Sequence, residues 1–329
     1  MKLDFDYVII FGMGTTGKSC LNFFNEYYKQ KFNHQLEVIC VDSDPLILDN
    51  LSFFDLRENT NDELYNDKLD PYLNDRTLIV WSPGISWENP LLKRCVELKL
   101  KIWSEIELAS RFFKKPIMAL TGTNGKTTTV SLIQHILEKC QQRSFLGGNI
   151  GLPFIEAVKN QDQYDLAILE ISSFQLEAIE SFHPNYAGIL NLYKNHEERY
   201  NNFEDYVAAK CNILKNLTNK DIFYKRENEP ALENVIEKRS KKILCKIKTI
   251  PNHLIKNTQF WGTLDANQLP LKGAHNLDNL ALAKLFLNDW GIKDQEIELA
   301  MLDFKAISYR LEKIYENKML DIFNVIKIR

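Results

Sequence analysis

Residues 120–129 combine glycine, lysine and threonine at a spacing that suits a nucleoside triphosphate: Leu-Thr-Gly-Thr-Asn-Gly-Lys-Thr-Thr-Thr. Gly122 and Gly125 let the backbone turn its N–H groups toward a phosphate. Lys126 supplies a full positive charge, and the hydroxyl of Thr127 is a ligand for Mg²⁺. The strict form of this motif has glycine at the first position, where this chain has leucine. The segment therefore predicts a phosphate-binding loop with one departure.

Such a loop needs a strand before it and a helix after it. Residues 117–121 are an apolar run that predicts a strand. The residues after the loop predict a helix with one apolar face, made of Val130, Ile133, Ile136, Leu137 and Cys140. The alternative is a turn rich in glycine and threonine that binds no ligand, and the strand–loop–helix context favours the phosphate site.

Two more polar residues follow predicted strands of the same unit. Glu170 ends the apolar run 166–169, and His196 follows the run 188–192. Because the carboxyl ends of parallel strands meet at one edge of a sheet, we expect Glu170 beside the phosphate loop, where its carboxylate could hold Mg²⁺. His196 would reach the same edge. The alternatives are a solvated glutamate and a structural or solvated histidine.

Two predicted helices carry further polar candidates. Lys210 lies on the apolar face of a helix over 203–214. Burial would lower the pKa of its amine, and a neutral amine can react with CO₂ to give an anionic carbamate. The alternative is a lysine whose charged end reaches water. In a helix over 276–290, Asn276 and Asn279 share one face and could read a purine edge, or Asn276 could simply cap that helix.

A second glycine-rich turn, Gly12-Met13-Gly14-Thr15-Thr16-Gly17, lies near the N-terminus. It follows a strand predicted over 7–11 and precedes a helix predicted to begin near Lys18. Another predicted strand, over 36–41, ends at Asp42. This is the dinucleotide-binding fingerprint, with its acidic residue about 25 positions on instead of about 20. Taken alone, it predicts NAD binding.

The alternation of strands and helices predicts an α/β protein with two units. A Rossmann-like, doubly wound parallel sheet would occupy 1–113, and a central ATP-binding unit of the P-loop ATPase type would occupy 114–303. Residues 304–329 would be a separate stub. Other elements expected in the first unit are strands at 78–81 and 101–103 and a helix at 90–98. Residues 218–270 predict only short strands.

The composition excludes several classes of protein. With 41 Lys and Arg against 44 Asp and Glu, the formal net charge of −3 provides no general attraction for nucleic acid or an anionic membrane. The 6 cysteines form no C-x-x-C pair, so we expect reduced thiols and neither a zinc site nor disulfides. Neither a signal peptide nor a run of about 20 apolar residues is found. We expect a cytoplasmic protein.

Together, these motifs resemble those of the Mur ligase family, and the resemblance covers nearly the whole chain. The string at 172–177, Ser-Ser-Phe-Gln-Leu-Glu, is typical of the branch that adds D-glutamate. The segments that carry the resemblance are Gly12–Gly17, Ser82-Pro83-Gly84-Ile85, Thr121–Thr128, Gly147-Gly148-Asn149-Ile150-Gly151, Glu170–Glu177, His196 with Arg199, Ala208-Ala209-Lys210, His275-Asn276 with Asn279, and Tyr309-Arg310-Leu311-Glu312.

The resemblance implies a role for each candidate residue. For ATP, it implies Gly122, Thr123, Asn124, Gly125, Lys126, Thr127, Thr128, Thr129, Asn276, Asn279 and Arg310. For a UDP-linked substrate, it implies Gly14, Thr15, Thr16, Asp42, Ser43, Ser82, Pro83, Gly84 and Asn149. For two Mg²⁺ ions, it implies Thr127, Glu170, His196 and Lys210, the last as a possible carbamate. The catalytic set would be Lys126, Asn149, Glu170, His196 and Lys210.

The activity implied by the resemblance is ATP-dependent amide bond formation in peptidoglycan precursor synthesis. D-Glutamate would be joined to UDP-N-acetylmuramoyl-L-alanine through an acyl phosphate, by a cytoplasmic monomer that binds neither nucleic acid nor membrane. Two anions meet in the first step, so Mg²⁺ and lysine would lower the barrier. One alternative is a nicotinamide-dependent oxidoreductase or NAD sensor, which binding of NADH instead of ATP·Mg would reveal. Another is a non-catalytic relative, which would differ from the ligase only in turnover.

The chain departs from the family in two places. The loop 195–199 has glutamate where aspartate is common. In the family, Arg310 opens a third domain that brings a lysine toward ATP and binds the carboxylates of D-glutamate, whereas this chain ends at Arg329 and lacks an expected Asp-Ser-Lys string. We therefore expect a ligase truncated at its C-terminus, with a tail over 313–329 that is poorly ordered or packs non-natively. We also expect slow or absent turnover in a coupled assay.

Overall fold

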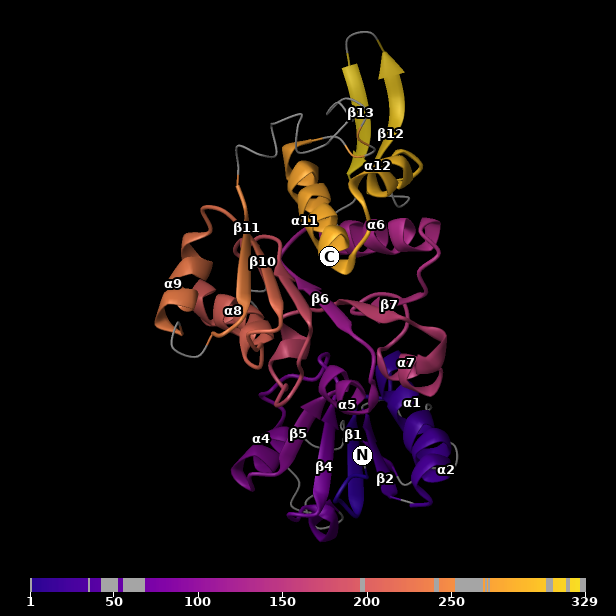
Figure 1. The fold of residues 1–329 in the computed structure, drawn as a ribbon. Coiled ribbons are helices and arrows are strands. Elements are labelled where there is room, and N and C mark those ends of the chain that lie inside the picture. The colour runs from indigo at the N-terminus through magenta and orange to yellow at the C-terminus, as the bar shows by residue number, and fades with distance from the viewer. Residues whose placement is uncertain are drawn as a thin grey trace.

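The computed structural model describes residues 2–34, 36–42, 53–55, 69–195, 199–239, 243–251, 269, 271, 273–305, 310–317 and 320–325. Within these ranges the chain forms two parallel sheets flanked by helices, one after the other along the sequence (Figure 1). The predicted α/β fold class is confirmed.

The N-terminal sheet has five parallel strands in the order β3-β2-β1-β4-β5. The strands are β1 (Tyr7–Phe11), β2 (Glu37–Asp42), β3 (Phe53–Asp55), β4 (Thr77–Trp81) and β5 (Lys101–Ser104). The helices are α1 (Thr15–Asn22), a π-helical continuation (Phe23–Tyr28), α2 (Lys29–Phe32), α4 (Pro90–Glu97) and α5 (Glu105–Phe112). The strand order reverses between β1 and β4, and open α/β sheets bind ligands beyond the carboxyl ends of the strands at such a point.

The second sheet has six parallel strands in the order β11-β10-β9-β6-β8-β7. They are β6 (Ile117–Thr121), β7 (Ser144–Gly148), β8 (Leu166–Glu170), β9 (Tyr186–Ile189), β10 (Ile222–Arg226) and β11 (Lys246–Ile250). The helices around it are α6 (Lys126–Lys139), α7 (Ile155–Lys159), α8 (Phe203–Lys210), α9 (Pro230–Lys238), α11 (Ala274–Trp290) and α12 (Asp294–Leu302). Strands β6 and β8 are buried along their whole length, so helices must cover both faces of the sheet here.

One hydrophobic cluster runs through both units. Val8 and Ile10 of β1 belong to it, together with Ala119 of β6 and Val207 of α8. Alternate residues of the same strands point the other way, as the period of two in a strand requires. Ile9 thus joins a cluster with α4, and Met118 and Leu120 join a cluster with α6, α11 and α12. The two units therefore share a continuous interior, in which α1 and α5 of the N-terminal unit pack against α7 of the central unit.

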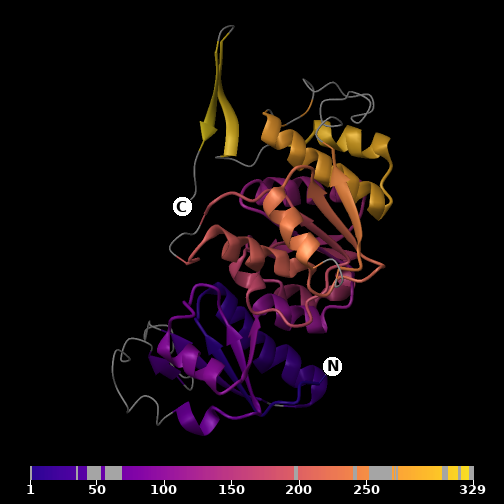
Figure 2. The ribbon, with the colours of Figure 1, turned by 90° about the vertical axis from the view of Figure 1, so that its left-hand side faces the viewer.

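At the end of the chain, β12 (Arg310–Asn317) and β13 (Leu320–Val325) form an antiparallel pair. Among the described strands they pair only with each other. Figure 2 shows this pair, in yellow, extending away from the two sheets. The expected state of the tail and the expected domain limits stay predictions.

The structure departs from the predicted elements in several places. Helices α5, α7 and α12 were not predicted, and the helix predicted over 203–214 is α-helical only to Lys210 and continues as a 3-10 turn over Cys211–Leu214. Helix α9, within the stretch predicted to hold only short strands, begins at Pro230 and buries Leu232. Strand β7 ends in two glycines, which are depleted in strands, and the sequence analysis did not predict it. Helix α1 begins at Thr15, three residues before the predicted start near Lys18.

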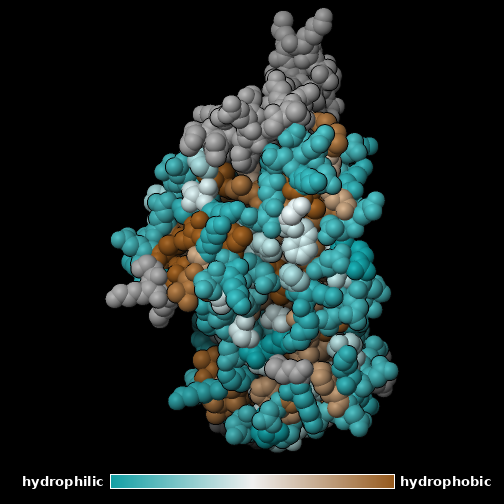
Figure 3. Space-filling view, in the orientation of Figure 1, coloured by the Kyte–Doolittle hydropathy of each residue, from teal (hydrophilic) through white to brown (hydrophobic). Residues whose placement is uncertain are grey.

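Most of the surface visible in Figure 3 is hydrophilic, and hydrophobic residues gather on its left side, over the region of α9 and β11. Within the described parts of the chain, no helix combines the length and the apolar character that a membrane span requires.

Candidate nucleotide-binding and active site

The loop between β6 and α6 has a backbone that only glycine adopts easily at two positions. Gly122 has a φ of +148° and Gly125, the N-cap of α6, has a φ of +82°. Gly125 also leaves no room for a side chain, because an added Cβ would lie 2.5 Å from Oδ1 of Asn279 on α11. At Gly125 the loop therefore packs against α11. Gly125 is also the N-cap of α6, and the N–H groups at this helix N-terminus favour an anion.

The loop is held from one side by Asn191, which follows β9. Its backbone oxygen accepts a hydrogen bond from the N–H of Thr123 at 2.9 Å. Its side chain accepts from the N–H of Asn124 at 2.9 Å and donates to the oxygen of Asn124 at 3.0 Å. Sequence reasoning did not select Asn191, and its position right after an apolar strand at the ligand edge is the only signal that could have.

Lys126 lies over the loop that it follows. Its Nζ donates to the backbone oxygens of Gly122 at 2.9 Å and Thr123 at 3.1 Å. A phosphate bound at the helix N-terminus would offer the same ammonium group a stronger, charged acceptor.

Glu170, at the end of β8, joins three of the predicted residues. Its carboxylate is 2% exposed, accepts the Thr127 hydroxyl at 2.7 Å, and accepts Nδ2 of Asn149 at 3.0 Å. The N–H of Asn149 also donates to the backbone oxygen of Glu170 at 2.8 Å. Neighbouring parallel strands β6, β8 and β7 bring these side chains to the same sheet edge. A buried carboxylate beside a hydroxyl supplies the hard oxygen ligands that Mg²⁺ prefers.

Lys210, at the end of α8, is 2% exposed and reaches the other side of the loop. Its Nζ donates to the backbone oxygen of Gly122 at 2.9 Å and to Oγ1 of Thr121 at 3.3 Å. Burial lowers the pKa of this amine well below its ordinary value, the positive charge of Lys126 lowers it further, and Glu170 opposes both effects. The arrangement favours a neutral amine beside the phosphate loop.

Asn276 and Asn279 are both buried near the start of α11, and Nδ2 of Asn279 donates to Oδ1 of Asn276 at 3.3 Å. Two other predicted residues, Ser43 and His196, lie outside the described residues, as do the side chains of His275 and Arg310. Among the described residues no group of three His, Cys, Asp or Glu side chains could hold a metal ion. Of the predicted metal ligands, the structure therefore brings together Thr127, Glu170 and Lys210 around the loop.

The N-terminal glycine turn lies at the carboxyl ends of β1, β2 and β4. Gly12 has a φ of +86°, and its oxygen accepts a hydrogen bond from Oγ of Ser82 at 3.1 Å. Asp42 accepts the N–H of Met13 at 2.5 Å. Asp42 therefore shapes the turn itself, in addition to any contact with a ligand. Gly14 is the N-cap of α1, whose first residues are Thr15 and Thr16.

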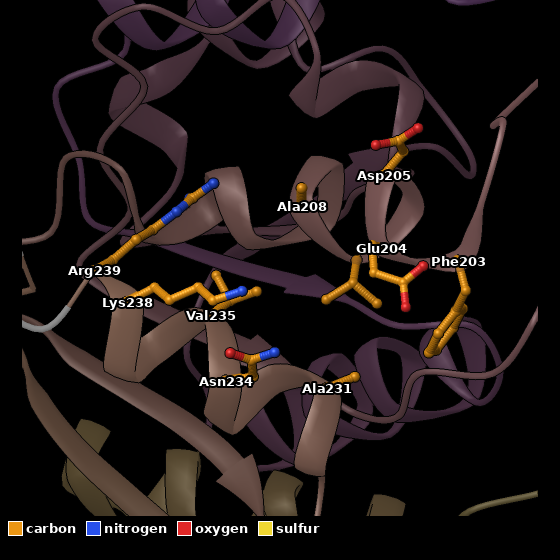
Figure 4. A pocket seen from close by; sticks show the side chains of 10 residues that line it. Phe203, Glu204, Asp205, Ala208, Ala231, Asn234, Val235, Lys238 and Arg239 are labelled. Atoms are coloured by element: carbon orange, nitrogen blue, oxygen red, sulfur yellow. The ribbon is translucent and has the colours of Figure 1, made fainter.

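A separate hollow of about 340 Å³ lies between α8 and α9 (Figure 4). Lys238 and Arg239 lie at one end of it, and Glu204 and Asp205 lie at the other. It contains none of the predicted site residues.

Two known protein-family domains match this chain. The Mur ligase middle domain matches residues 120–287, and the Mur ligase MurD-like N-terminal domain matches residues 6–104. The chain belongs to the Mur ligase family. The N-terminal glycine turn thus lies within a Mur ligase domain, and nothing supports the alternative of an NAD-dependent oxidoreductase.

Curated relatives share about a third of their residues with this chain. The UDP-N-acetylmuramoylalanine–D-glutamate ligase of Acidobacterium capsulatum is 37% identical over 263 residues, which are 75% of this chain and 56% of the relative. The ligase of the same name from Streptococcus thermophilus is 34% identical over 245 residues, 71% of this chain and 54% of the relative. The chain thus spans a little over half the length of these relatives.

Solved structures show the same fold at low sequence identity. The UDP-N-acetylmuramate:L-alanyl-γ-D-glutamyl-meso-diaminopimelate ligase from Neisseria meningitides has a TM-score of 0.56 at 15% identity and covers 92% of this chain and 99% of that one. A murein peptide ligase from Psychrobacter arcticus has a TM-score of 0.54 at 16% identity, with coverages of 98% and 73%.

Proposed function

We propose that this chain holds the ATP site and the UDP-substrate site of an enzyme that joins D-glutamate to UDP-N-acetylmuramoyl-L-alanine. The observation that carries the proposal is the convergence of Thr127, Asn149 and Glu170 at the sheet edge beside the phosphate loop. The names of the curated relatives supply the substrates. The proposed setting is peptidoglycan precursor synthesis in the cytoplasm, by a monomer.

The proposed ATP site begins at the loop 122–127. Its N–H groups and the N-terminus of α6 would bind the phosphates, and Lys126 would exchange its two carbonyl acceptors for phosphate oxygens. Thr123, Asn124, Thr128 and Thr129 complete the loop and the first turn of the helix. Asn279 lies against Gly125 and donates a hydrogen bond to Asn276; both would approach the nucleoside, with Arg310 as a further proposed contact.

Thr127 and Glu170 would hold one Mg²⁺, because their oxygens already lie 2.7 Å apart and form a hard donor pair. His196 and a carbamate on Lys210 are proposed for a second. Mg²⁺ in such a site neutralises the charge of the transferred phosphate and of the attacking carboxylate.

Lys210 suits carbamate formation because burial lowers the pKa of its amine, which favours the neutral, nucleophilic form. The lone pair of Nζ would form a C–N bond to CO₂, and one proton would leave to solvent. The product is an anion at a place where the free amine now donates to Gly122 and Thr121. A buried lysine would thus become a ligand for a cation.

In the proposed first step, the alanyl carboxylate of the substrate attacks the γ-phosphorus of ATP, and ADP leaves with the bridging oxygen. Asn149 would orient that carboxylate; its position just after β7, with its amide hydrogen-bonded to Glu170, supports this role. The amine of D-glutamate then attacks the acyl carbon, phosphate leaves, and the amine releases a proton. Positive charge fixed in advance by the loop, Lys126 and the helix N-terminus lowers the barrier to the meeting of two anions.

The UDP part of the substrate is proposed to bind at the N-terminal turn. Gly14, Thr15 and Thr16 present the start of α1 there, and Ser82 with Pro83 and Gly84 borders it from β4. Asp42 and Ser43 would complete this site. The helix N-terminus again favours a phosphate.

Trapping the acyl phosphate tests the proposal. The chain is incubated with ATP, Mg²⁺, UDP-N-acetylmuramoyl-L-alanine and hydroxylamine, without D-glutamate, and the hydroxamate is measured. We expect hydroxamate that requires ATP, and its loss in Lys126→Ala with the exposed Lys139→Ala as a control. A chain that forms no hydroxamate and binds NADH but not ATP·Mg would overturn the proposal.

A further inference from the structure

Arg199 joins the two units at the point where their proposed ligand sites face each other. It lies three residues after His196 in the sequence, and its side chain is 16% exposed. Its Nη1 donates to the backbone oxygen of Pro83 at 3.2 Å, and its Nη2 forms an ion pair with Glu177 at 2.7 Å. One side chain of the central unit thus holds the Ser82–Gly84 loop of the N-terminal unit.

Glu177 receives donors from both units. Its Oε2 accepts Nε1 of Trp87, from the N-terminal unit, at 2.6 Å. Its Oε1 accepts the hydroxyl of Tyr200, from the central unit, at 2.6 Å. With its side chain 12% exposed, this carboxylate accepts hydrogen bonds from Arg199 and Tyr200 of its own unit and from Trp87 of the other. Separation would remove the acceptors of the Trp87 indole N–H and of Arg199 Nη1, which is costly in a partly buried place.

Aromatic rings fix the direction of the Arg199 side chain. Its guanidinium lies 4.4 Å from the ring centroid of Phe174 in the central unit and 5.2 Å from that of Trp81 in the N-terminal unit. Trp81 lies 4.6 Å from Trp87. A planar guanidinium can stack on these rings while its rigid fork donates to two acceptors, whereas a lysine ammonium is a point charge without that fixed plane.

The same contacts continue to the phosphate loop. The ring of Tyr200 lies 5.5 Å from the ring of Tyr206, whose hydroxyl shares a hydrogen bond of 3.0 Å with Oγ1 of Thr123. The Nζ of Lys210 lies 4.8 Å from the ring of Tyr206. Packed side chains therefore connect the loop proposed for the UDP-substrate with the loop proposed for ATP.

We propose that Arg199 and Glu177 are positioning residues that couple the two ligand sites. Arg199 holds the Ser82–Gly84 loop in the place where a UDP-linked substrate directs its carboxylate toward ATP, and Glu177 fixes Arg199. The inference rests on the proposed function and deepens it. It predicts that each ligand strengthens the binding of the other, and that the coupling passes through this pair.

Calorimetry on the full chain measures the coupling directly. The affinity for a non-hydrolysable ATP analogue with Mg²⁺ is measured with and without saturating UDP-N-acetylmuramoyl-L-alanine. We expect the substrate to strengthen nucleotide binding about tenfold in the wild type, within the usual range of such couplings. In Arg199→Lys and in Glu177→Gln the gain should fall below about twofold, while the analogue alone binds within about twofold of the wild type.

Arg111→Lys is the matched control. Arg111 also crosses between the units, because it bonds to Glu180 at 3.0 Å and lies 3.9 Å from the ring of Trp103, and it is 18% exposed. Its side-chain hydrogen bonds within the described part of the chain go to Glu107 and Glu180, away from the phosphate loop, so its variant should keep the tenfold coupling.

The outcomes separate this inference from the proposed function. Full coupling in Arg199→Lys, equal loss in Arg111→Lys, or two ligands that bind the wild type independently would overturn the inference and leave the function standing. A wild-type chain that binds neither ligand would overturn the proposed function and this inference with it.

Discussion

Replacing Glu107 by glutamine should cost the protein about 3–5 kcal/mol of stability. Glu107 lies on α5 of the N-terminal unit, and its side chain is 0% exposed. One carboxylate oxygen accepts the N–H groups of Glu180, Ser181 and Phe182 at 2.9, 2.9 and 2.7 Å. The other accepts the hydroxyl of Ser181 and Nε of Arg111, both at 2.7 Å. The residue pins the segment 180–182 of the central unit onto the N-terminal unit.

The magnitude follows from the number of donors. Glutamine has the same shape but one acceptor oxygen. If that oxygen keeps the three backbone N–H groups, the amide NH₂ faces Nε of Arg111, a donor, while the Ser181 hydroxyl can turn to accept from it. A buried donor left without its acceptor costs about 1–3 kcal/mol. Loss of the charge that pairs with Arg111 adds to this, and breaking a buried pair typically costs about 3–5 kcal/mol.

Urea unfolding followed by circular dichroism and by tryptophan fluorescence measures the effect. The control is Glu180→Gln, because the Glu180 side chain also pairs with Arg111 but is 44% exposed. Screening by water limits that control to less than about 1 kcal/mol. If Glu107→Gln lost no more stability than Glu180→Gln, the account of this contact would be refuted.

Three further predictions concern single positions. Gly125→Ala should weaken binding of the Mg²⁺-bound ATP analogue at least about tenfold in calorimetry, because the new Cβ would meet Asn279 in a backbone conformation that L residues rarely adopt; unchanged affinity would contradict this. Burial raises the pKa of Glu105 from 4.5 to about 7, so the folded chain binds this proton more tightly and stability should fall as pH rises between those values. Glu105→Gln should remove that fall, and urea midpoints of both proteins at pH 5 and pH 8 check it; a constant difference between them would show that Glu105 does not titrate there. Wild-type protein in ¹³C-bicarbonate should give a carbamate resonance that is absent from Lys210→Arg, and equal spectra would exclude carbamylation of Lys210.

The elements around the phosphate loop could be predicted because their signals are local. The strand 117–121, the Gly122 and Gly125 turns and the helix after Lys126 are each encoded within a few residues, and strand topology then requires Glu170 to lie at the same edge. Helix α9 carries Leu232, Val235 and Ile236 at helical spacing after Pro230, and this local signal was overlooked. Strand β7 was missed because its glycines have low strand propensity.

Contacts between the two units could not be predicted from the sequence. Glu107 meets Ser181, 74 positions later, and Arg199 meets Pro83, 116 positions earlier. No local pattern encodes which charged side chain will cross an interface, since that depends on how two finished sheets pack. Asn191 is a different case, because it contacts the loop within one unit, from just after β9, the strand next to β6.

The central claim is that Glu170 and the phosphate loop form one site for Mg²⁺-bound ATP, and Mg²⁺-dependent nucleotide binding tests it most directly. Calorimetry with the non-hydrolysable ATP analogue is carried out with Mg²⁺ and with EDTA, on the wild type and on Glu170→Gln. The control is Glu138→Gln, because Glu138 is exposed on α6. We predict that Mg²⁺ strengthens nucleotide binding in the wild type and in Glu138→Gln. In Glu170→Gln, which lacks the anionic ligand, the affinity measured with Mg²⁺ should be lower than that of the wild type by at least about tenfold. Equal Mg²⁺ dependence in Glu170→Gln and the wild type would contradict the claim.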